Sequence, residues 1–451
     1  MSVVLCPLGE VCKTTSGGTP SRSKPHYFDG TIPWVKSGEL TDGIVVENSE
    51  YINEEAISNS SAKLLPAGTL LVALYGATVG KLGILSRPAA TNQAVCAIFP
   101  SEAIDTKFLF WYLLAKRPWL IGQAAGGAQP NISQGVVRSL LLPVMPLPEQ
   151  HAIVAEIEKQ FSRLDEAVAN LQRVKANLKR YKASVLKDAV EGRLVPTEAE
   201  LARRESRSFE TGQQLLQRIL EARQKQWDGK GKFKESVAPI VEGLPELPEG
   251  WAWARLDSVA ALKGGITVDS KRVDPTARMV PYLRVANVQR GYLDLTEIKQ
   301  ISASPADVTE LRLEFGDILF NEGGDRDKLG RGWIWEKQVA DCIHQNHVFR
   351  ARMLLPEMVP KLTSWWGNTF GRAYFQRMGK QTTNLASINL GKLSEFPVPI
   401  PPVAEQLRLV TEIERLLSVV DRVAAEVEVN LTRAQALRQS TLIKAFSEGQ
   451  T

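Results

Sequence analysis

The stretch LPVMPLPEQ at Leu142–Gln150 decides the fold of this chain, because a close copy of it, PVPIPPVAEQ, returns at Pro397–Gln406. In both copies, closely spaced prolines precede a Glu-Gln pair and then a long segment without proline. Proline is tolerated in the first turn of a helix and holds the residue before it in an extended conformation. Each copy therefore predicts a strand, a stiff turn and the start of a helix.

The likeness between the two halves extends upstream of this stretch, as expected for an internal repeat. IPWVKSGEL at Ile32–Leu40 faces VPYLRVANV at Val280–Val288, and PAGTLLVA at Pro66–Ala73 faces EFGDILF at Glu314–Phe320. The anchor residues Leu8, Gly17, Pro33, Gly43 and Gly68 return 248 residues later as Leu256, Gly265, Pro281, Gly291 and Gly316.

The offset between the copies grows along the chain. It becomes 252 where Asn92-Gln93 is aligned with His344-Gln345, and 256 from Gly135 and Gly391 onward. This growth indicates two small loop insertions in the second copy, after which the two copies stay aligned.

A long helix with a coiled-coil seam is predicted after each Glu-Gln pair, because apolar positions recur there with spacing 4-3-4-3. Each run covers about 40 residues, hence about 60 Å of helix. The first seam is Ile153, Ile157, Gln160, Leu164, Ala167, Leu171, Val174, Leu178, Tyr181 and Val185. The second is Leu409, Ile413, Leu416, Val420, Val423, Val427, Asn430, Ala434, Leu437 and Thr441.

Neither helix can bury its seam alone, so we expect the two helices to pack on each other, with Asn430 as a polar position that fixes the register. Antiparallel packing is favoured, because it relates the two modules by a pseudo-two-fold axis. A parallel pair stays open as an alternative, since the segment between the copies is long enough to reach back along the helices.

The predicted fold class is α+β, with two homologous mixed α/β modules separated by an antiparallel two-helix coiled coil. The expected boundaries are a first module at 1–148, a first helix at 149–192, a charged linker at 193–248, a second module at 249–404 and a second helix at 405–448. The linker is expected to contain a short helix near Thr211–Trp227 and to end in the turn LPELPEGW at Leu244–Trp251.

Composition limits the class of protein. Hydrophobic residues make up 44% of the chain and charged residues 23%, and no apolar run approaches the roughly 18 residues that span a bilayer. The first residues predict a strand and not a signal peptide, and the four scattered cysteines predict free thiols in the cytoplasm. A net charge of +5 permits a polyanionic partner, although solvated helix faces would give the same total.

Two motifs look chemical but do not predict a site. Gly76–Lys81 resembles a phosphate loop, yet it is one residue short between its glycines and has Leu82 where Ser or Thr would hold a metal. Cys342, His344 and His347 could bind a metal, but the first copy has no ligands at the aligned position. With four histidines in the chain and no recognisable catalytic motif, we expect no catalytic residue and no metal site.

Together, these segments resemble the specificity subunit of a type I restriction-modification system (the HsdS family), in order and over the whole chain. The segments that carry the resemblance are GGTPSR at Gly17–Arg22, IPWVKSGEL, the Gly76–Gly80 turn, NISQG at Asn131–Gly135, PLPEQ before the helix, and LPELPEGW before the second copy.

The resemblance implies that each copy is a target-recognition domain for one half of a split, asymmetric DNA site, with the helices setting the gap between the halves. It implies two methyltransferase (modification) subunits as partners, and it allows restriction/translocase subunits to join them. S-adenosylmethionine, Mg and ATP would be bound by those partners, with no cofactor in this chain. Because methylation requires base flipping, the DNA would be distorted. The second copy has GGITVDS in place of GGTPSR, which indicates a different half site.

Base edges are read chiefly by Arg, Lys, Asn and Gln, so polar loop residues are the candidates for DNA contact. In the first copy they are Thr19, Ser21, Arg22, Lys24, Lys36, Ser37, Tyr75, Lys81, Asn92, Gln93, Asn131, Ser133 and Gln134. In the second copy they are Arg284, Asn287, Gln289, Arg290, Asn321, Arg326, Lys328, Arg331, Gln345, Asn346, Gln381, Asn384 and Asn389. For each of them the alternative is a turn-capping or solvated polar residue.

Other assignments have alternatives as well. Trp34 and Tyr282 could stack on a displaced base, but a core position beside a proline is favoured. Partner docking is expected to use Phe161, Leu186 and Phe446 on the outward side of the helices. A stand-alone methyltransferase or nuclease with degenerate motifs, and a coiled-coil scaffold without a DNA role, are the competing functions.

Overall fold

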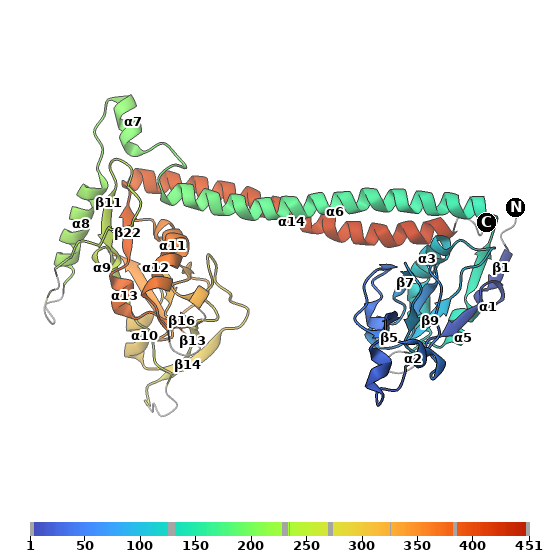
Figure 1. Cartoon of the computed structure of the whole chain (residues 1–451). Coiled ribbons are helices and arrows are strands. Elements are labelled where there is room, and N and C mark those ends of the chain that lie inside the picture. Colours follow the sequence, from blue (N-terminus) through green and yellow to red (C-terminus); the bar gives the residue numbers. More distant parts are fainter. Residues whose placement is uncertain are drawn as a thin grey trace. The chain divides into compact units, whose positions relative to one another are not determined.

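The computed structural model describes residues 4–124, 131–227, 233, 235–268, 274–324, 326–381 and 386–447, without the side chains of 380 and 381. The chain forms two compact units (Figure 1). Unit 1 comprises Met1–Val174 and Glu426–Thr451, and unit 2 comprises Lys175–Ala425. Each unit contains one copy of the repeat and parts of both long helices, and each is described by itself.

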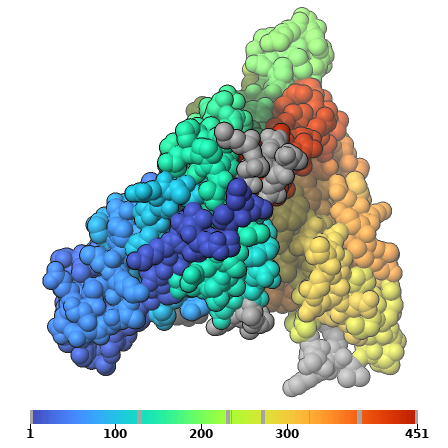
Figure 2. All heavy atoms as spheres, turned by 90° about the vertical axis from the view of Figure 1, so that its right-hand side faces the viewer, coloured from blue at the N-terminus to red at the C-terminus, as the bar shows by residue number. Residues whose placement is uncertain are grey.

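Unit 1 is built on a five-stranded sheet with the order β2-β9-β6-β7-β4, a three-stranded sheet β5-β3-β8, and the pair β1-β10. Strand β6 is apolar and buried along its whole length, as expected for the centre of a sheet. β1 and β10 lie side by side on the face shown in Figure 2. The bounds are β1 (Val4–Pro7), β2 (Thr14–Ser16), β3 (Ile32–Val35), β4 (Gly43–Val45), β5 (Tyr51–Ile52), β6 (Leu70–Ala73), β7 (Leu82–Leu85), β8 (Ala90–Thr91), β9 (Val95–Ile98) and β10 (Leu141–Val144).

Helices cover the core of unit 1, where Phe108 of α3 and Phe446 of α14 make an edge-to-face contact at 5.5 Å. Asp105 caps α3 by accepting a hydrogen bond from the Phe108 amide at 2.9 Å. The bounds are α1 (Leu8–Val11), η1 (Pro25–Phe28), η2 (Ser37–Glu39), α2 (Glu54–Ser58), η3 (Gly76–Thr78), α3 (Thr106–Ala115), α4 (Arg117–Gly122), α5 (Gln134–Ser139), α6 (Leu147–Val190) and α14 (Val403–Ser447).

Unit 2 contains the sheets β12-β19-β15-β17, β14-β13-β18 and β16-β21-β20, and the pair β11-β22. Its central strand β15 is buried throughout, as β6 is in unit 1. The bounds are β11 (Ala252–Arg255), β12 (Ala260–Lys263), β13 (Arg278–Leu283), β14 (Lys299–Ala303), β15 (Ile318–Asn321), β16 (Gly323–Gly324), β17 (Gly332–Ile334), β18 (Ile343–His344), β19 (Val348–Met353), β20 (Lys380–Gln381), β21 (Ala386–Ser387) and β22 (Pro397–Ile400).

The linker between the copies is folded onto the second module. Leu215 and Ile219 of α8 are fully buried beside Val398 and Ile400 of β22, so α8 closes the outer face of the β11-β22 pair. The helices of unit 2 are α7 (Glu198–Glu205), α8 (Gly212–Lys225), α9 (Leu256–Val259), α10 (Pro305–Leu311), η4 (Arg326–Lys328), α11 (Pro360–Asn368), α12 (Phe370–Met378) and α13 (Leu390–Ser394).

The two copies share their strand pairing, which corrects one alignment made from the sequence. Trp34 pairs with Ala90, and Tyr282, 248 positions after Trp34, pairs with Ile343. Ala90 is therefore equivalent to Ile343, and the offset here is 253 and not 252. Asn92-Gln93 corresponds to Gln345-Asn346, one residue later than predicted. Sequence identity alone favoured an alignment of Gln93 with Gln345. The strand pairing instead fixes how the two copies align.

The predicted antiparallel helix pair is confirmed within each unit, and the parallel alternative is wrong. In unit 1, Arg438 in the second half of α14 pairs with Asp165 in the first half of α6 at 2.7 Å. In unit 2, Lys182 near the end of α6 pairs with Asp421 of α14 at 3.1 Å. Figure 1 shows α6 and α14 running alongside each other.

The buried seam differs from the predicted one at every second position. Ile157, Leu164, Leu171, Leu178 and Val185 are buried or half-buried as expected. The positions between them lie one residue later, so that Phe161 and Val168 replace Gln160 and Ala167. The same shift occurs in α14. The predicted seam residues Val174, Tyr181, Val423 and Leu437 are 39%, 48%, 38% and 53% exposed, and Asn430 is exposed too.

A buried glutamine fixes the start of each long helix to its module. The Gln150 side chain donates to the carbonyls of Ala103 and Met145, and its Oε1 accepts from the Asp105 amide at 2.8 Å. In unit 2, Gln406 donates to the Pro401 carbonyl at 2.9 Å and accepts from the Val359 amide at 3.1 Å. The glutamine of the repeated stretch is thus the joint between module and helix.

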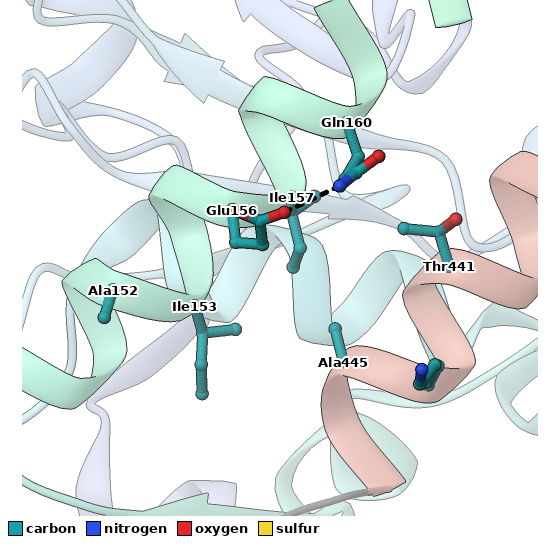
Figure 3. A pocket seen from close by; sticks show the side chains of 8 residues that line it. Ala152, Ile153, Glu156, Ile157, Gln160, Thr441 and Ala445 are labelled. Carbon is teal, nitrogen blue, oxygen red and sulfur yellow. Dashed lines mark hydrogen bonds between the residues drawn. The ribbon is translucent and has the colours of Figure 1, made fainter. Parts of the chain in front are cut away.

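A groove of about 520 Å³ lies between the start of α6 and the end of α14 in unit 1. Figure 3 shows Ile153 and Ile157 on one wall and Thr441 and Ala445 on the other. In unit 2 the equivalent surface, around Leu409 and Ile413, is covered by apolar side chains from the linker and the turn after it, among them Leu194, Val195, Leu247 and Trp251. The linker therefore makes the two ends of the helix pair unequal.

The described residues include no helix that is both long enough and apolar enough to cross a membrane.

Candidate nucleic-acid interface

The segments that follow β3, β6 and β8 meet at one face of module 1, which we call its loop face. The Asn92 amide donates to the Val35 carbonyl at 3.0 Å, and the Leu74 amide donates to the Ala94 carbonyl at 2.8 Å. The Ile132 amide, just before α5, donates to the Leu74 carbonyl at 2.9 Å. Residues far apart in the sequence are thereby held together by the backbone.

Each module has a pair of adjacent glycines, Gly17-Gly18 and Gly264-Gly265, and one glycine of each pair lies directly against the backbone of the loop face. A Cβ atom on Gly17 would lie 2.2 Å from the Asn92 carbonyl oxygen, and one on Gly265 would lie 2.0 Å from the His344 carbonyl oxygen. No side chain fits at either position. The two glycines therefore let the chain pass directly against the backbone of the loop face.

Arg22 and Lys36 share one carboxylate on the loop face of module 1. Arg22 pairs with Glu50 at 2.7 Å and Lys36 pairs with it at 2.8 Å. The hydrogen bond from Lys36, followed by that from Arg22, lowers the pKa of Glu50. The Arg22 guanidinium also lies 4.3 Å from the Phe28 ring centroid, yet its side chain is 58% exposed. Arg22 is therefore held over an aromatic ring and open to a ligand.

Thr19 and Gln93 are both exposed and hydrogen bonded to each other. Asn92 beside them is half-buried, and its Oδ1 has no hydrogen-bond partner among the described residues. Tyr75 is 42% exposed and bridges through its backbone to Asn131, which is exposed as well. The structure thus brings Thr19, Asn92 and Gln93 together, as it does Tyr75 and Asn131.

Several other candidates in module 1 have structural partners. Ser133 caps α5 by accepting from the Val136 amide at 3.2 Å, and Gln134 donates to Thr14 and accepts from Ser16. These two residues have structural partners in the fold, and their assignment as DNA readers stays a prediction. Lys81 pairs with Asp42 at 2.9 Å.

The remaining candidates of module 1 are near the η1 and η2 turns. Ser21 bonds Ser23 at 2.8 Å, and Lys24 donates to the Tyr27 hydroxyl at 2.8 Å, both at exposed positions. Ser37 is half-buried at the start of η2.

Module 2 repeats the backbone of this loop face. The Gln345 amide donates to the Leu283 carbonyl at 2.9 Å, and the Glu322 amide donates to the His347 carbonyl at 3.0 Å. The Ile388 amide donates to the Glu322 carbonyl at 2.8 Å. These bonds match, one for one, the three that hold the loop face of module 1.

Two buried amides correct predictions in module 2, and a half-buried guanidinium group there has backbone partners. Asn287, 3% exposed, donates to the carbonyls of Asp294 and Glu297, and Asn321, fully buried, donates to the Val288 carbonyl at 2.8 Å. Arg290 donates to the carbonyls of Asn368 and Asp327, and burial lowers its pKa. All three residues hold loops in place, because a buried backbone carbonyl needs a donor.

Arg331 and Asn389 also have structural partners. Arg331 donates to the Val285 carbonyl at 3.2 Å, and Asn389 caps α13 by accepting from the Lys392 amide at 2.9 Å. Arg284 is largely buried and lies 3.5 Å from Glu297. Gln289, Arg326, Lys328, Gln345 and Asn346 also keep exposed or half-exposed side chains. Asn384 and the side chain of Gln381 lie outside the described residues.

Trp34 and Tyr282 are core residues, as favoured from the sequence. Trp34 is 2% exposed and donates through Nε1 to the Gly18 carbonyl at 3.0 Å, and Tyr282 is 7% exposed. Phe161 and Phe446 are 3% and 6% exposed inside unit 1, and Leu186 packs into the core of unit 2. The expectation that these three residues dock a partner is therefore wrong.

Sequence reasoning missed Glu322 as a loop-face residue and considered His347 only as a metal ligand. His347 is hydrogen bonded to Glu322 and is 54% exposed, whereas His344 is fully buried and bonded to the Val348 carbonyl. Burial lowers the pKa of His344 to about 4. An alignment with the offset of 253 would have placed His347 opposite Ala94 and drawn attention to it.

The sequence matches the family described as type I restriction modification DNA specificity domain over residues 3–180. The Escherichia coli EcoR124I/EcoR124II type I restriction enzyme specificity subunit is 32% identical over 168 residues, which cover 36% of this chain and 41% of that protein. The EcoKI specificity subunit of Escherichia coli strain K12 is 21% identical over 453 residues, covering 98% of this chain and 88% of that protein.

Solved structures share the whole fold. A chain solved in work on complex assembly and conformational transition of the type I R-M system matches with a TM-score of 0.63 and 19% identity, over 99% of this chain and 97% of that one. The HsdS subunit from Thermoanaerobacter tengcongensis matches with a TM-score of 0.58 and 16% identity, over 98% and 96% of the two chains.

Two repeated α/β modules joined to an antiparallel helix pair are the fold that this chain shares with solved type I R-M chains. The sequence matches place it in the class of DNA sequence-specificity components of restriction enzymes. Within that class, the chain is similar over nearly its whole length to the family of type I restriction enzyme specificity subunits, whose DNA specificity domain matches its residues 3–180. Members of this family are non-catalytic, and the catalytic activities lie in partner subunits.

Proposed function

We propose that each module reads one half of a bipartite, asymmetric DNA site. The observation that carries the proposal is that the two loop faces have the same backbone hydrogen bonds but different side chains. Gln93 of module 1 is replaced by Asn346, and Leu74 and Ala94 are replaced by Glu322 and His347. A shared frame with different donors and acceptors is what two different half sites require.

We further propose that the helix pair sets the gap between the half sites and docks two methyltransferase subunits. Support comes from a second apolar stripe on the helices, formed by the predicted seam positions that turn outward. Tyr181 and Leu437 are equivalent in the repeat and are 48% and 53% exposed. Val174 and Val423 add to this stripe at 39% and 38% exposure. Exposed apolar side chains recurring along a helix favour a protein partner.

In this proposal S-adenosylmethionine, Mg and ATP are bound by the partner subunits, with restriction/translocase subunits as further members of the complex. The DNA candidates that we favour all have exposed or half-exposed side chains: Thr19, Ser21, Arg22, Lys24, Lys36, Tyr75, Gln93 and Asn131 in module 1, and Gln289, Arg326, Lys328, Gln345 and Asn346 in module 2. We place the complex in the cytoplasm, where its DNA substrate lies.

Duplicating module 1 tests the two-reader proposal. Residues 252–402 are replaced by residues 4–146, so that both helices follow the same module. This direction is chosen because the β1-β10 pair leaves Val4 and Leu141 57% and 49% exposed and needs no equivalent of α8. With the methyltransferase subunits present, we expect methylome sequencing to show an inverted repeat of the first half site.

The wild-type complex, sequenced alongside, identifies both half sites. An unchanged site in the duplicated protein, or loss of the first half site, would contradict the proposal. The purified chain alone, incubated with DNA, S-adenosylmethionine and magnesium, is expected to transfer no methyl group and to cleave no DNA.

A further inference from the structure

A cleft of about 490 Å³ opens on the loop face of module 2, and its lining includes Glu322, His347, Gly323 and Gly324. Glu322 follows strand β15, and His347 lies between β18 and β19. The two side chains are hydrogen bonded through His347 Nδ1 and Glu322 Oε2, and they are 54% and 26% exposed. An acid and an imidazole thus line a cleft that is partly open to solvent.

The same backbone in module 1 has apolar residues at these two positions. Leu74 is equivalent to Glu322 and Ala94 to His347, because the amide of the first residue donates to the carbonyl of the second in both modules. Leu74 and Ala94 are 2% and 9% exposed. Since the frame folds with apolar residues here, the polar pair is not required by the fold.

The cleft also depends on a glycine that module 1 lacks. Gly323 pairs with Ser387 in the β16-β21 ladder, whereas the equivalent Tyr75 forms a bridge with Asn131 and extends an exposed side chain. Gly324, beside it, has φ +136, a conformation that favours glycine. The cleft is therefore lined by backbone where module 1 has an aromatic ring.

The free oxygen of Glu322 sets the ligand chemistry. Oε2 is held by His347, and Oε1 makes no hydrogen bond to any residue in the described part of the chain. A carboxylate oxygen accepts hydrogen bonds only, and the donor that DNA presents to a carboxylate in the major groove is chiefly the exocyclic amino group of cytosine. The acceptor-rich edge of guanine and the phosphates would be repelled.

We propose that Glu322 reads a cytosine at one position of the second half site, accepting from the cytosine N4 amino group, and that His347 acts as a positioning residue for its carboxylate. This inference rests on the proposed function, in which module 2 reads one half site. It adds a specificity-determining pair and the base that this pair selects.

The test compares two variants of the full chain in complex with the methyltransferase subunits. Glu322→Gln keeps the shape of the side chain but adds a donor, and an amide suits adenine. We expect preference for cytosine at one position of the second half site to fall about 10-fold or more, with adenine gaining there. The double variant Glu322→Leu with His347→Ala copies module 1, and it should accept any base at that position.

Three controls accompany these variants. The first half site should be methylated as in the wild type, which shows that the complex assembles. Glu310→Gln changes an exposed acid of α10 that pairs with Lys263, and it should leave every position unchanged. His347→Ala alone should weaken the cytosine preference less than the double variant does, as expected for a residue that acts through another.

Outcomes that overturn the cleft proposal and the proposed function are distinct. If the wild type reads two half sites and both Glu322 variants keep every base preference, the cleft does not read DNA. If the position that changes is not cytosine, the assigned base is wrong. A wild-type complex that reads one continuous site would instead overturn the two-reader proposal itself.

Discussion

At the scale of single residues, the same buried position can bear different chemistry in the two modules. Thr91 of β8 and His344 of β18 are both fully buried. Thr91 directly follows Ala90, which pairs with Trp34, and His344 directly follows Ile343, which pairs with Tyr282. His344 is held by the Val348 carbonyl at 2.6 Å. Module 2 therefore carries a buried imidazole where module 1 carries a hydroxyl.

This difference predicts a pH dependence that only module 2 has. Burial lowers the pKa of His344 to about 4 from 6.5, so between these values the unfolded chain takes up a proton that the folded chain does not. The free energy of unfolding therefore falls as the pH falls through this window, by about 3 kcal/mol in total. His344→Thr should remove this loss, as measured by hydrogen exchange of module 2 between pH 7 and 4.

Thr91→Ser in module 1 is the matched control, and it should leave the pH dependence of both modules unchanged. At pH 7 the His344→Thr variant loses one buried hydrogen bond and is expected to be less stable than the wild type by about 1 kcal/mol. An equal pH dependence of module 2 in wild type and variant would show that His344 titrates normally.

Residue types alone could not separate DNA readers from residues that hold loops. Asn287, Asn321 and Asn389 satisfy backbone groups of the loops in which they lie, and Arg22 and Gln93 do not. All five are polar loop residues in the sequence. The difference is decided for Asn287 and Asn321 by burial, which depends on strand pairing between distant segments, and for Asn389 by its hydrogen bond at the start of α13. The sequence therefore placed candidates on the loop face but could not show which of them are held by backbone partners.

At the scale of elements, each long helix carries two apolar stripes that the sequence pattern merges into one. The seam is continued by positions such as Val420 and Val427, which are 4% and 5% exposed. Val423 and Leu437 lie on the outward stripe. Both stripes have heptad spacing. Periodicity therefore predicts the helices, but it cannot decide which of two neighbouring positions completes the seam in each heptad.

A pair of valines two residues apart tests this assignment. Val427 is 5% exposed and Val429 is 44% exposed, both in the part of α14 that belongs to unit 1. Val427→Ser should lower the free energy of unfolding by about 1–3 kcal/mol, because it removes buried apolar surface. Val429→Ser should change it by about 0.5 kcal/mol at most. Urea denaturation followed by circular dichroism measures both values.

Equal losses of stability in the two variants would mean that the helices pack through both faces. A smaller loss for Val427→Ser than for Val429→Ser would place the seam on the opposite face of α14 and contradict the assignment.

Most elements could be predicted because they rest on local signals. The proline-rich turns predicted both long helices, whose observed starts at Leu147 and Val403 lie within two residues of the expected ones. The helix predicted near Thr211–Trp227 is present as α8, but its packing on β22 was not foreseen. Helix α7 was missed although Thr197 and Glu200 form a capping box that signals its start.

At the scale of the whole molecule, the repeat joins two modules with different loop-face side chains to helices that share one register. The offset between the copies grows within the modules and is constant through the helices. Gln150 and Gln406 join each helix to its own module by the same kind of hydrogen bonds. A change in helix length should therefore leave the reading of bases intact and alter the distance between the half sites.

Removing facing heptads from the two helices tests this expectation. Because Asp165 faces Arg438, residues 168–174 face 429–435, and deleting both segments keeps the seam in phase. Seven residues of helix span about 10 Å, which corresponds to about three base pairs of DNA. Methylome sequencing is expected to show both half sites unchanged and a gap shorter by about three base pairs. Deleting only 168–174 should instead misalign the seam and lower stability, and an unchanged gap in the double deletion would mean that the helices do not set the spacing.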